Sequence, residues 1–184
     1  MAKDIEMIVF GGGCFWCTEA LFKSLKGVIS VHSGYAGGSE VDATYEKVSS
    51  GKTGHAECIE ITYDKEQITF NDLLSVFFNT HDPTTLNQQG ADYGTQYRSV
   101  IFYTTEEQKI EAEKLIKELN DTKAYERAVV TEVAPLDKFY EAEDYHKNYY
   151  DEHPEAAYCQ IVIAPKLERL QKRFGELVNT SPNL

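Results

Sequence analysis

The stretch Gly11-Gly12-Gly13-Cys14-Phe15-Trp16-Cys17 decides how this sequence folds. It follows a short apolar run over residues 5–10 and precedes a segment, residues 21–25, whose apolar side chains have helical spacing. The pattern predicts a strand, a glycine turn and a helix that begins at or near Cys14. The N-terminus of a helix favours a thiolate over a thiol, so this position predicts a reactive cysteine.

Other interpretations of this stretch are open from the residues alone. A cysteine after glycines is commonly a small buried apolar side chain, and the spacing of Cys14 and Cys17 can be half of a zinc site. The other cysteines, Cys58 and Cys159, are isolated in the sequence, which argues against zinc. The glycines also lack the order found in phosphate-binding loops. We therefore expect redox or nucleophilic use of Cys14, with no metal ion and no organic cofactor.

Composition limits the class of protein. The chain has 184 residues, of which 42% are hydrophobic and 26% charged, and this predicts one globular domain over residues 1–184. The net charge of −12 disfavours non-specific binding to nucleic acid or to a membrane surface. No apolar run approaches the roughly 18 residues of a membrane span, and no signal peptide is visible. With only four cysteines, the chain is expected to be a cytoplasmic protein, and we expect a monomer.

Strand and helix patterns interleave along the chain. Strict alternation predicts a strand over residues 57–63, with Glu57 on the face of the apolar side chains and Cys58 opposite as core filler. Helices are predicted over 70–78, after Thr105 and from Pro165 to about Gly175. Further strands are expected over 28–31, 99–103, 128–133 and 158–163, with loops over 33–39 and 81–96. These elements predict an α+β fold, a mixed sheet with helices packed on it.

A reactive cysteine needs a proton source and a site for the polar atom of its substrate. Two polar stretches offer candidates, which are Tyr45, His55 and Glu57 from the first and Asp92 and Tyr97 from the second. The alternative for each tyrosine is ordinary packing with a satisfied hydroxyl. His55 and Glu57 could likewise be a solvated polar pair in a turn.

Several motifs together resemble one known family. They are Gly12-Gly13-Cys14-Phe15-Trp16, Gly34-Tyr35-Ala36-Gly37-Gly38, Thr53-Gly54-His55-Ala56-Glu57, His81-Asp82-Pro83, Gly94-Thr95-Gln96-Tyr97-Arg98-Ser99 and, near the end, Tyr158-Cys159. In this order they resemble the A-type peptide methionine sulfoxide reductases. The resemblance covers about residues 11–99, and the set is specific although each motif alone would be weak.

The resemblance implies a role for each candidate. In that family the cysteine matching Cys14 attacks the sulfur of the S epimer of methionine sulfoxide, in a protein or as the free amino acid. The carboxyl group matching Glu57 protonates the sulfoxide oxygen, and the tyrosines matching Tyr45 and Tyr97 hydrogen-bond to it. The remaining matches are Asp92, which helps to hold a water molecule, and Phe15 and Trp16, which enclose the methyl group. His55, from the motif around Glu57, joins the predicted substrate-binding residues.

The resemblance also implies a recycling route and a fold. Cys14 becomes a sulfenic acid, a second thiol forms a disulfide with it, and thioredoxin reduces that disulfide. Cys159 matches the resolving cysteine of the family, while Cys17, which many members lack, is a second candidate. The implied fold is a two-layer α/β sandwich of ferredoxin-like type. Rival functions are a thioredoxin-like disulfide oxidoreductase built on Cys14 and Cys17, and a redox-sensing binding module.

Overall fold

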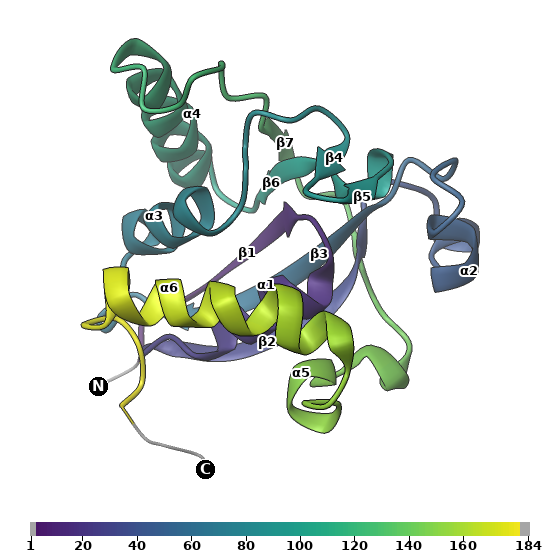
Figure 1. The fold of residues 1–184 in the computed structure, drawn as a ribbon. Coiled ribbons are helices and arrows are strands. Elements are labelled where there is room, and N and C mark those ends of the chain that lie inside the picture. Colours follow the sequence, from purple (N-terminus) through teal and green to yellow (C-terminus); the bar gives the residue numbers. More distant parts are fainter. Residues whose placement is uncertain (1–2, 181–184) are drawn as a thin grey trace.

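The computed structural model describes residues 3–180, which form a mixed six-stranded sheet with six α-helices (Figure 1). This confirms the predicted α+β class. The strands of the sheet are β1 (Ile5–Gly12), β2 (Val28–Ala36), β3 (Ala56–Asp64), β6 (Ser99–Tyr103), β7 (Glu132–Pro135) and β8 (Phe139–Glu141). The helices are α1 (Phe15–Lys23), α2 (Tyr45–Val48), α3 (Phe70–Thr80), α4 (Glu106–Asp121), α5 (Tyr149–Glu152) and α6 (Ala164–Phe174).

Strands β1 and β3 lie at the centre of the sheet, whose order is β7-β6-β1-β3-β2-β8. Every neighbouring pair is antiparallel except β6 and β7, which are parallel. Between α3 and β6 a two-stranded hairpin, β4 (Gln88–Gln89) with β5 (Asp92–Tyr93), stands apart from the sheet. Short helical segments complete the chain, of which η2 (Thr95–Tyr97), η3 (Asp144–His146) and the π-helix η4 (Cys159–Ile163) matter for the site.

Local sequence accounts for the helix boundaries. The side chain of Thr69 accepts a hydrogen bond from the Asp72 backbone while Asp72 binds the Thr69 backbone, so a full capping box begins α3. Thr105 caps α4 through the backbone N–H of Gln108, but the Gln108 side chain bonds to Thr104 instead of closing the box. Helices α3 and α4 therefore begin directly after their capping residues.

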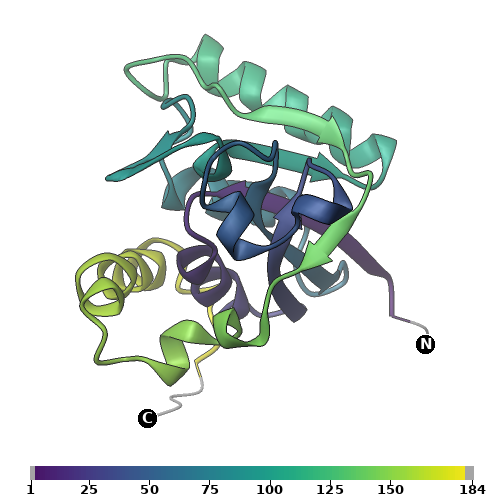
Figure 2. The ribbon, with the colours of Figure 1, turned by 90° about the vertical axis from the view of Figure 1, so that its right-hand side faces the viewer.

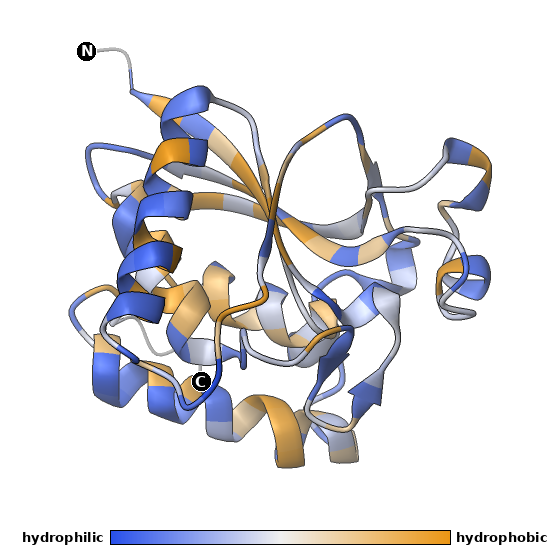
Figure 3. Cartoon of the chain, turned by 90° about the horizontal axis from the view of Figure 1, so that it is seen from above, coloured by the Kyte–Doolittle hydropathy of each residue, from blue (hydrophilic) through white to orange (hydrophobic). Residues whose placement is uncertain are grey.

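Buried apolar residues form clusters on both faces of the sheet. In Figure 3 hydrophobic segments recur along the strands and along the helices packed on them. On the larger face α1 and α3 cover the sheet, and Phe10 of β1 stacks on Phe77 of α3 with ring centroids 4.6 Å apart. Helix α6 then lies across α1 and α3 (Figures 1 and 2). On the other face Cys58 is fully buried among small and branched residues of β1, β2 and β6, which confirms its assignment as core filler.

The secondary structure differs from the prediction in three segments. Strand β2 continues through 33–36, where a loop was expected, because Gly34 lets β8 approach: a Cβ at Gly34 would come within 2.3 Å of the Tyr140 carbonyl. Strand β7 occupies 132–135 in place of 128–133. Residues 158–163, predicted as a strand, are helical instead. Cys159 and Ile163 lie four residues apart and share a buried face, whereas Ile161 is 73% exposed.

None of the helices within residues 3–180 is long and apolar enough to cross a membrane.

Candidate active site

Cys14 caps the N-terminus of α1, as the sequence predicted, immediately after the turn at Gly13. Gly13 has a φ of +97°, and a side chain there would collide with Gln89. The backbone carbonyl of Cys14 accepts the first helical hydrogen bonds, from Cys17 and Thr18, while its side chain makes no cap bond. The residue is half-buried, and its thiol lies near Glu57 and Tyr158, which come from distant parts of the sequence.

Burial reverses the predicted effect of the helix N-terminus on this thiol. Desolvation raises the pKa of Cys14 well above its usual value, and the negative charge of an ionised Glu57 raises it further. Hydrogen bonds from the Trp16 backbone and from Tyr158 act in the opposite direction without overcoming it. At neutral pH the thiol therefore keeps its proton in the unliganded protein.

Glu57 is a buried carboxyl group next to the Cys14 segment. It is 3% exposed on β3, and its Oε2 accepts a hydrogen bond of 3.1 Å from the backbone N–H of Phe15, the residue next to Cys14. Burial raises the pKa of Glu57 to about 8, and the charge of Asp92 adds to this, while the Phe15 N–H opposes it. A protonated carboxyl group at neutral pH thus lies beside the thiol.

Two tyrosines from different elements lie near Glu57 and Cys14. Tyr45 begins α2, and its backbone N–H donates to the Glu143 carboxylate at 3.2 and 3.3 Å. Tyr97 ends η2. Burial raises the pKa of both hydroxyls, and the proximity of Glu57 raises each further. Both phenols therefore remain protonated hydrogen-bond donors.

Asp92 is the first residue of β5, and the β4–β5 hairpin places it beside Tyr158. The hydroxyl of Tyr158, which directly precedes η4, donates to Asp92 Oδ2 at 3.3 Å and lies 3.6 Å from the Cys17 sulfur. Burial and the nearby Cys14 and Cys17 sulfur atoms raise the pKa of Tyr158. Tyr158 therefore links the thiols to the carboxylate.

Trp16 forms an aromatic wall. Its ring stacks on Tyr149 with centroids 3.7 Å apart and an angle of 6°, and its Nε1–H donates to His146 Nδ1 at 3.0 Å. Phe15 is buried behind it, against Tyr35 and His146, so it forms the floor of the site. The sequence-predicted group of Cys14, Glu57, the two tyrosines, Asp92 and the two aromatics is thus brought together.

Comparison with known proteins shows the family of this chain. The sequence matches the family model described as peptide methionine sulfoxide reductase over residues 6–177. The chain belongs to the peptide methionine sulfoxide reductase family. A protein of Sulfolobus acidocaldarius described as peptide methionine sulfoxide reductase MsrA is 53% identical to this reductase over 176 residues, 94% of this chain and 97% of the relative. The reductase is accordingly an oxidoreductase, a peptide-methionine (S)-S-oxide reductase.

Solved structures resemble this reductase as well. Reduced Mxr1 from Saccharomyces cerevisiae has a TM-score of 0.79 and 34% identity, with coverage of 85% of this chain and 90% of the yeast chain. The same yeast protein in complex with Trx2 has a TM-score of 0.56 and 24% identity, covering 81% of this chain and 89% of that chain.

His55 differs from expectation in this reductase. Its ring is fully buried, Nδ1 accepts the Gly38 backbone N–H at 3.1 Å, and Nε2 lies 2.8 Å from the Ser39 carbonyl. With both ring nitrogens used by the 38–39 backbone, His55 has no group left for a substrate. The geometry favours a structural role that holds this loop, in place of the predicted substrate contact.

His146 and Tyr149 were not among the predicted site residues. His146 is fully buried between the rings of Phe15, Trp16 and Tyr45, and burial lowers its pKa, so the ring is neutral. Because Nδ1 accepts from Trp16, the proton is on Nε2. The aromatic and acidic segment 139–150 was visible in the sequence, but its lack of a clear period hid which side chains face the site.

Cys17 and Cys159, the two candidate resolving thiols, lie in one small apolar cluster with Ile163. Both are buried, and all four cysteines of the chain are reduced in this structure. Burial raises the pKa of Cys17 and of Cys159. Cys159 is thus held in a helix against α1, and not in the strand that the sequence predicted.

Proposed function

We propose that Cys14 attacks the sulfur of methionine-S-sulfoxide, whether the residue is in a protein or is the free amino acid. The oxygen passes to Cys14, so the sulfoxide gains two electrons and leaves as methionine, while the thiol becomes a sulfenic acid. The observation that carries this proposal is the buried carboxyl group of Glu57, with its pKa of about 8, fixed beside Cys14 by the Phe15 N–H. Such a group supplies a proton at neutral pH to an oxygen that gains basicity during the attack.

The other polar groups are assigned to the sulfoxide oxygen and its surroundings. Tyr45 and Tyr97 would donate hydrogen bonds to the oxygen, since burial keeps both hydroxyls protonated. Asp92, held by Tyr158, would help to position water near the substrate. The apolar methyl group would lie against Trp16, above Phe15.

A direct assay tests this function against its rivals. N-acetyl methionine sulfoxide incubated with the protein and dithiothreitol is expected to yield N-acetyl methionine. Reduction of insulin disulfides without this reaction would support the thioredoxin-like oxidoreductase instead. If the protein shows neither activity, the result would support the redox-sensing binding module.

The S epimer is expected to react and the R epimer to be inert. One nucleophile, one methyl wall at Trp16 and one oxygen site at Glu57 are fixed relative to one another, and three groups around a stereocentre accept one hand. The measurement is methionine release from the two resolved sulfoxides in parallel. Comparable rates on both would contradict this arrangement.

For the resolving step we propose a disulfide between Cys14 and Cys159, with Cys17 assisting or substituting. The sulfenic acid condenses with the second thiol and releases water, which balances the oxygen. Support comes from Tyr158, the residue before Cys159, whose hydroxyl lowers the pKa of the Cys14 thiol through a hydrogen bond. The π-helix that carries Cys159 is an uncommon conformation frequent at functional sites.

Peptide mapping after one turnover without reductant tests the resolving thiol. The expected dominant species links Cys14 to Cys159, and Cys159→Ser should slow recycling while leaving the first turnover intact. Cys17→Ser is the matched control, expected to recycle at a reduced but measurable rate. A dominant Cys14–Cys17 disulfide with normal recycling of Cys159→Ser would overturn the assignment.

Thioredoxin is the proposed reductant. The yeast relative Mxr1 has been crystallised in complex with Trx2, and a protein disulfide that forms in each cycle needs a dithiol to reduce it. We expect the reductase to act as a monomer with no cofactor.

We also infer that the chain is one catalytic domain with a core of ferredoxin-like type. The order β1-α1-β2-β3-α3-β6 and the spatial order β6-β1-β3-β2 support that type. The family match over residues 6–177 supports a single domain.

A further inference from the structure

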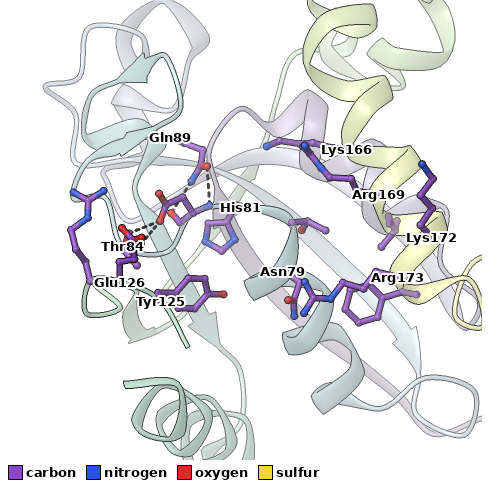
Figure 4. Close-up of a pocket in the computed structure, with 15 residues that line it drawn as sticks. Asn79, His81, Thr84, Gln89, Tyr125, Glu126, Lys166, Arg169, Lys172 and Arg173 are labelled. Carbon is purple, nitrogen blue, oxygen red and sulfur yellow. Dashed lines mark hydrogen bonds between the residues drawn. The ribbon is translucent and has the colours of Figure 1, made fainter. Parts of the chain in front are cut away.

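A cavity lies beside the active site, between α6 and the segments that follow α3 and α4 (Figure 4). Its volume is about 640 Å³, within the range of roughly 300–1,000 Å³ typical of ligand sites. His81, Gln89 and Tyr125 form one side, and α6 forms the other. We call this cavity the α6 groove.

The α6 groove is cationic on a strongly acidic protein. Two acidic side chains, Asp82 and Glu126, line it together with five cationic ones, a net charge of +3, whereas the whole chain carries −12. The cationic residues are Arg127, Lys166, Arg169, Lys172 and Arg173. Three of the four arginines of the chain are therefore in this one place.

Most of these charges lack a partner. Of the five, only Lys172 forms an ion pair within residues 3–180, with Glu168 at 2.9 Å. Figure 4 shows Lys166 and Arg169 extending from α6 toward the wall that carries Gln89, while Lys172 points away. Arg98, the arginine outside the groove, is by contrast fully engaged with Glu132 and two backbone carbonyls.

The groups that face these cations offset their charge only in part, since Asp82 and Glu126 are the two acidic residues among the lining residues. Burial raises the pKa of Asp82, but two hydrogen bonds from Thr84, at 2.6 and 2.9 Å, and the charge of Arg127 lower it overall. His81 is neutral, because burial lowers its pKa to about 4, and its two ring nitrogens bond to Phe77 and Ser99. The hydroxyl of Tyr125 is bound to the Phe78 carbonyl. The groove thus offers guanidinium and ammonium groups to an anion from outside.

The groove and the active site share a wall. Gln89 lines the groove, and its side chain packs against Gly13, one residue before the nucleophile. Across the hairpin, Gln89 pairs directly with Asp92, which faces the active site. On the opposite side Lys166 is near enough for its charge to lower the pKa of Cys17, against the larger effect of burial. An extended peptide advances about 3.3 Å per residue, so a few residues connect the two places.

We propose that the α6 groove binds an acidic segment of the oxidised polypeptide substrate, through carboxylates a few residues from the methionine sulfoxide. This inference rests on the proposed function and adds a substrate class to it. Carboxylates are the peptide groups that arginine binds best, through paired hydrogen bonds. The whole chain carries a net charge of −12, whereas the lining residues of this groove carry +3 and therefore attract an acidic segment.

The test uses N-acetylated peptides with one methionine-S-sulfoxide and three Glu, three Gln or three Lys residues on one side of it, with dithiothreitol as reductant. The acidic peptide is expected to have a KM about five- to ten-fold below that of the neutral peptide, with similar kcat, because several partly exposed charge pairs add modest effects. Raising the salt concentration should reduce this difference, since the Debye length falls from about 10 Å at 0.1 M to 3 Å at 1 M.

A charge-matched pair of variants assigns the effect to the groove. Arg127→Gln with Arg169→Gln should remove most of the preference for the acidic peptide, whereas Lys114→Gln with Lys117→Gln on α4 removes the same charge elsewhere and should preserve it. Equal KM values for the three peptides would overturn the proposal. So would a groove variant that slows only thioredoxin-supported turnover, which would assign the groove to the reductant. If no peptide is reduced, including the neutral one, the proposed function itself fails.

Discussion

Cys14→Ser is expected to lose essentially all methionine sulfoxide reduction, on the order of 10⁴-fold or more, while the protein stays folded. A serine hydroxyl in this buried position is a far weaker nucleophile toward sulfur than a thiol. The fold should survive because Cys14 makes no side-chain cap bond to α1, and serine is a preferred residue at a helix N-cap. The measurement is methionine release in a single turnover, together with the thermal unfolding midpoint.

Cys17→Ser is the matched control for this experiment, since it makes the same change three residues along α1. Its first turnover should remain close to that of the wild type, because Cys17 is assigned only to the later thiol exchange. A folded Cys14→Ser protein that still releases methionine at the normal rate would rule out Cys14 as the nucleophile.

Glu57→Gln is expected to slow the reductive step by about 10²–10⁴-fold and to leave formation of the later disulfide nearly unchanged. Glutamine can still accept the Phe15 N–H that Glu57 accepts, but it cannot deliver a proton. The rate to follow is single-turnover methionine release.

The pH dependence gives a second measure of the same group. Burial raises the pKa of Glu57 to about 8, so the protonated form is dominant at pH 7 and is lost as the pH rises through 8. The wild-type reductive rate should lose this acid contribution above pH 8, and Glu57→Gln should lack that decline. Glu60→Gln is a control on the same strand, where the side chain points to the opposite face. An unchanged rate in Glu57→Gln would mean that another group is the acid.

The predictions for Cys14 and Glu57 both depend on the burial of these two side chains. At neutral pH both Cys14 and Glu57 carry their protons, so neither group is charged before substrate arrives. Keeping Glu57 neutral also removes the like charge that would otherwise oppose ionisation of the thiol. In the proposed attack the Glu57 proton passes to the sulfoxide oxygen, and the Glu57 carboxylate formed in this way accepts the proton of the thiol.

Local sequence determined the parts of the site that local interactions can form. The strand, glycine turn and helix around Cys14 follow from the apolar spacing and from the glycines before Cys14, of which Gly13 adopts a positive φ. The starts of α3 and α4 follow from the capping residues Thr69 and Thr105. The alternation over 57–63 correctly separated Glu57 from Cys58. The two polar stretches offered Tyr45, Tyr97 and Asp92 as candidates, and the family resemblance then implied a role for each.

Only the tertiary structure decided the environment of these groups. The pKa values of Cys14 and Glu57 depend on desolvation by the folded chain, and for Cys14 that desolvation outweighs the helix N-terminus on which the prediction for the thiol rested. His146 is 130 residues from the Trp16 that it binds, and Cys159 is helical because a buried face packs it against Cys17. Periodicity describes one element at a time, whereas burial and charge are properties of the elements that meet.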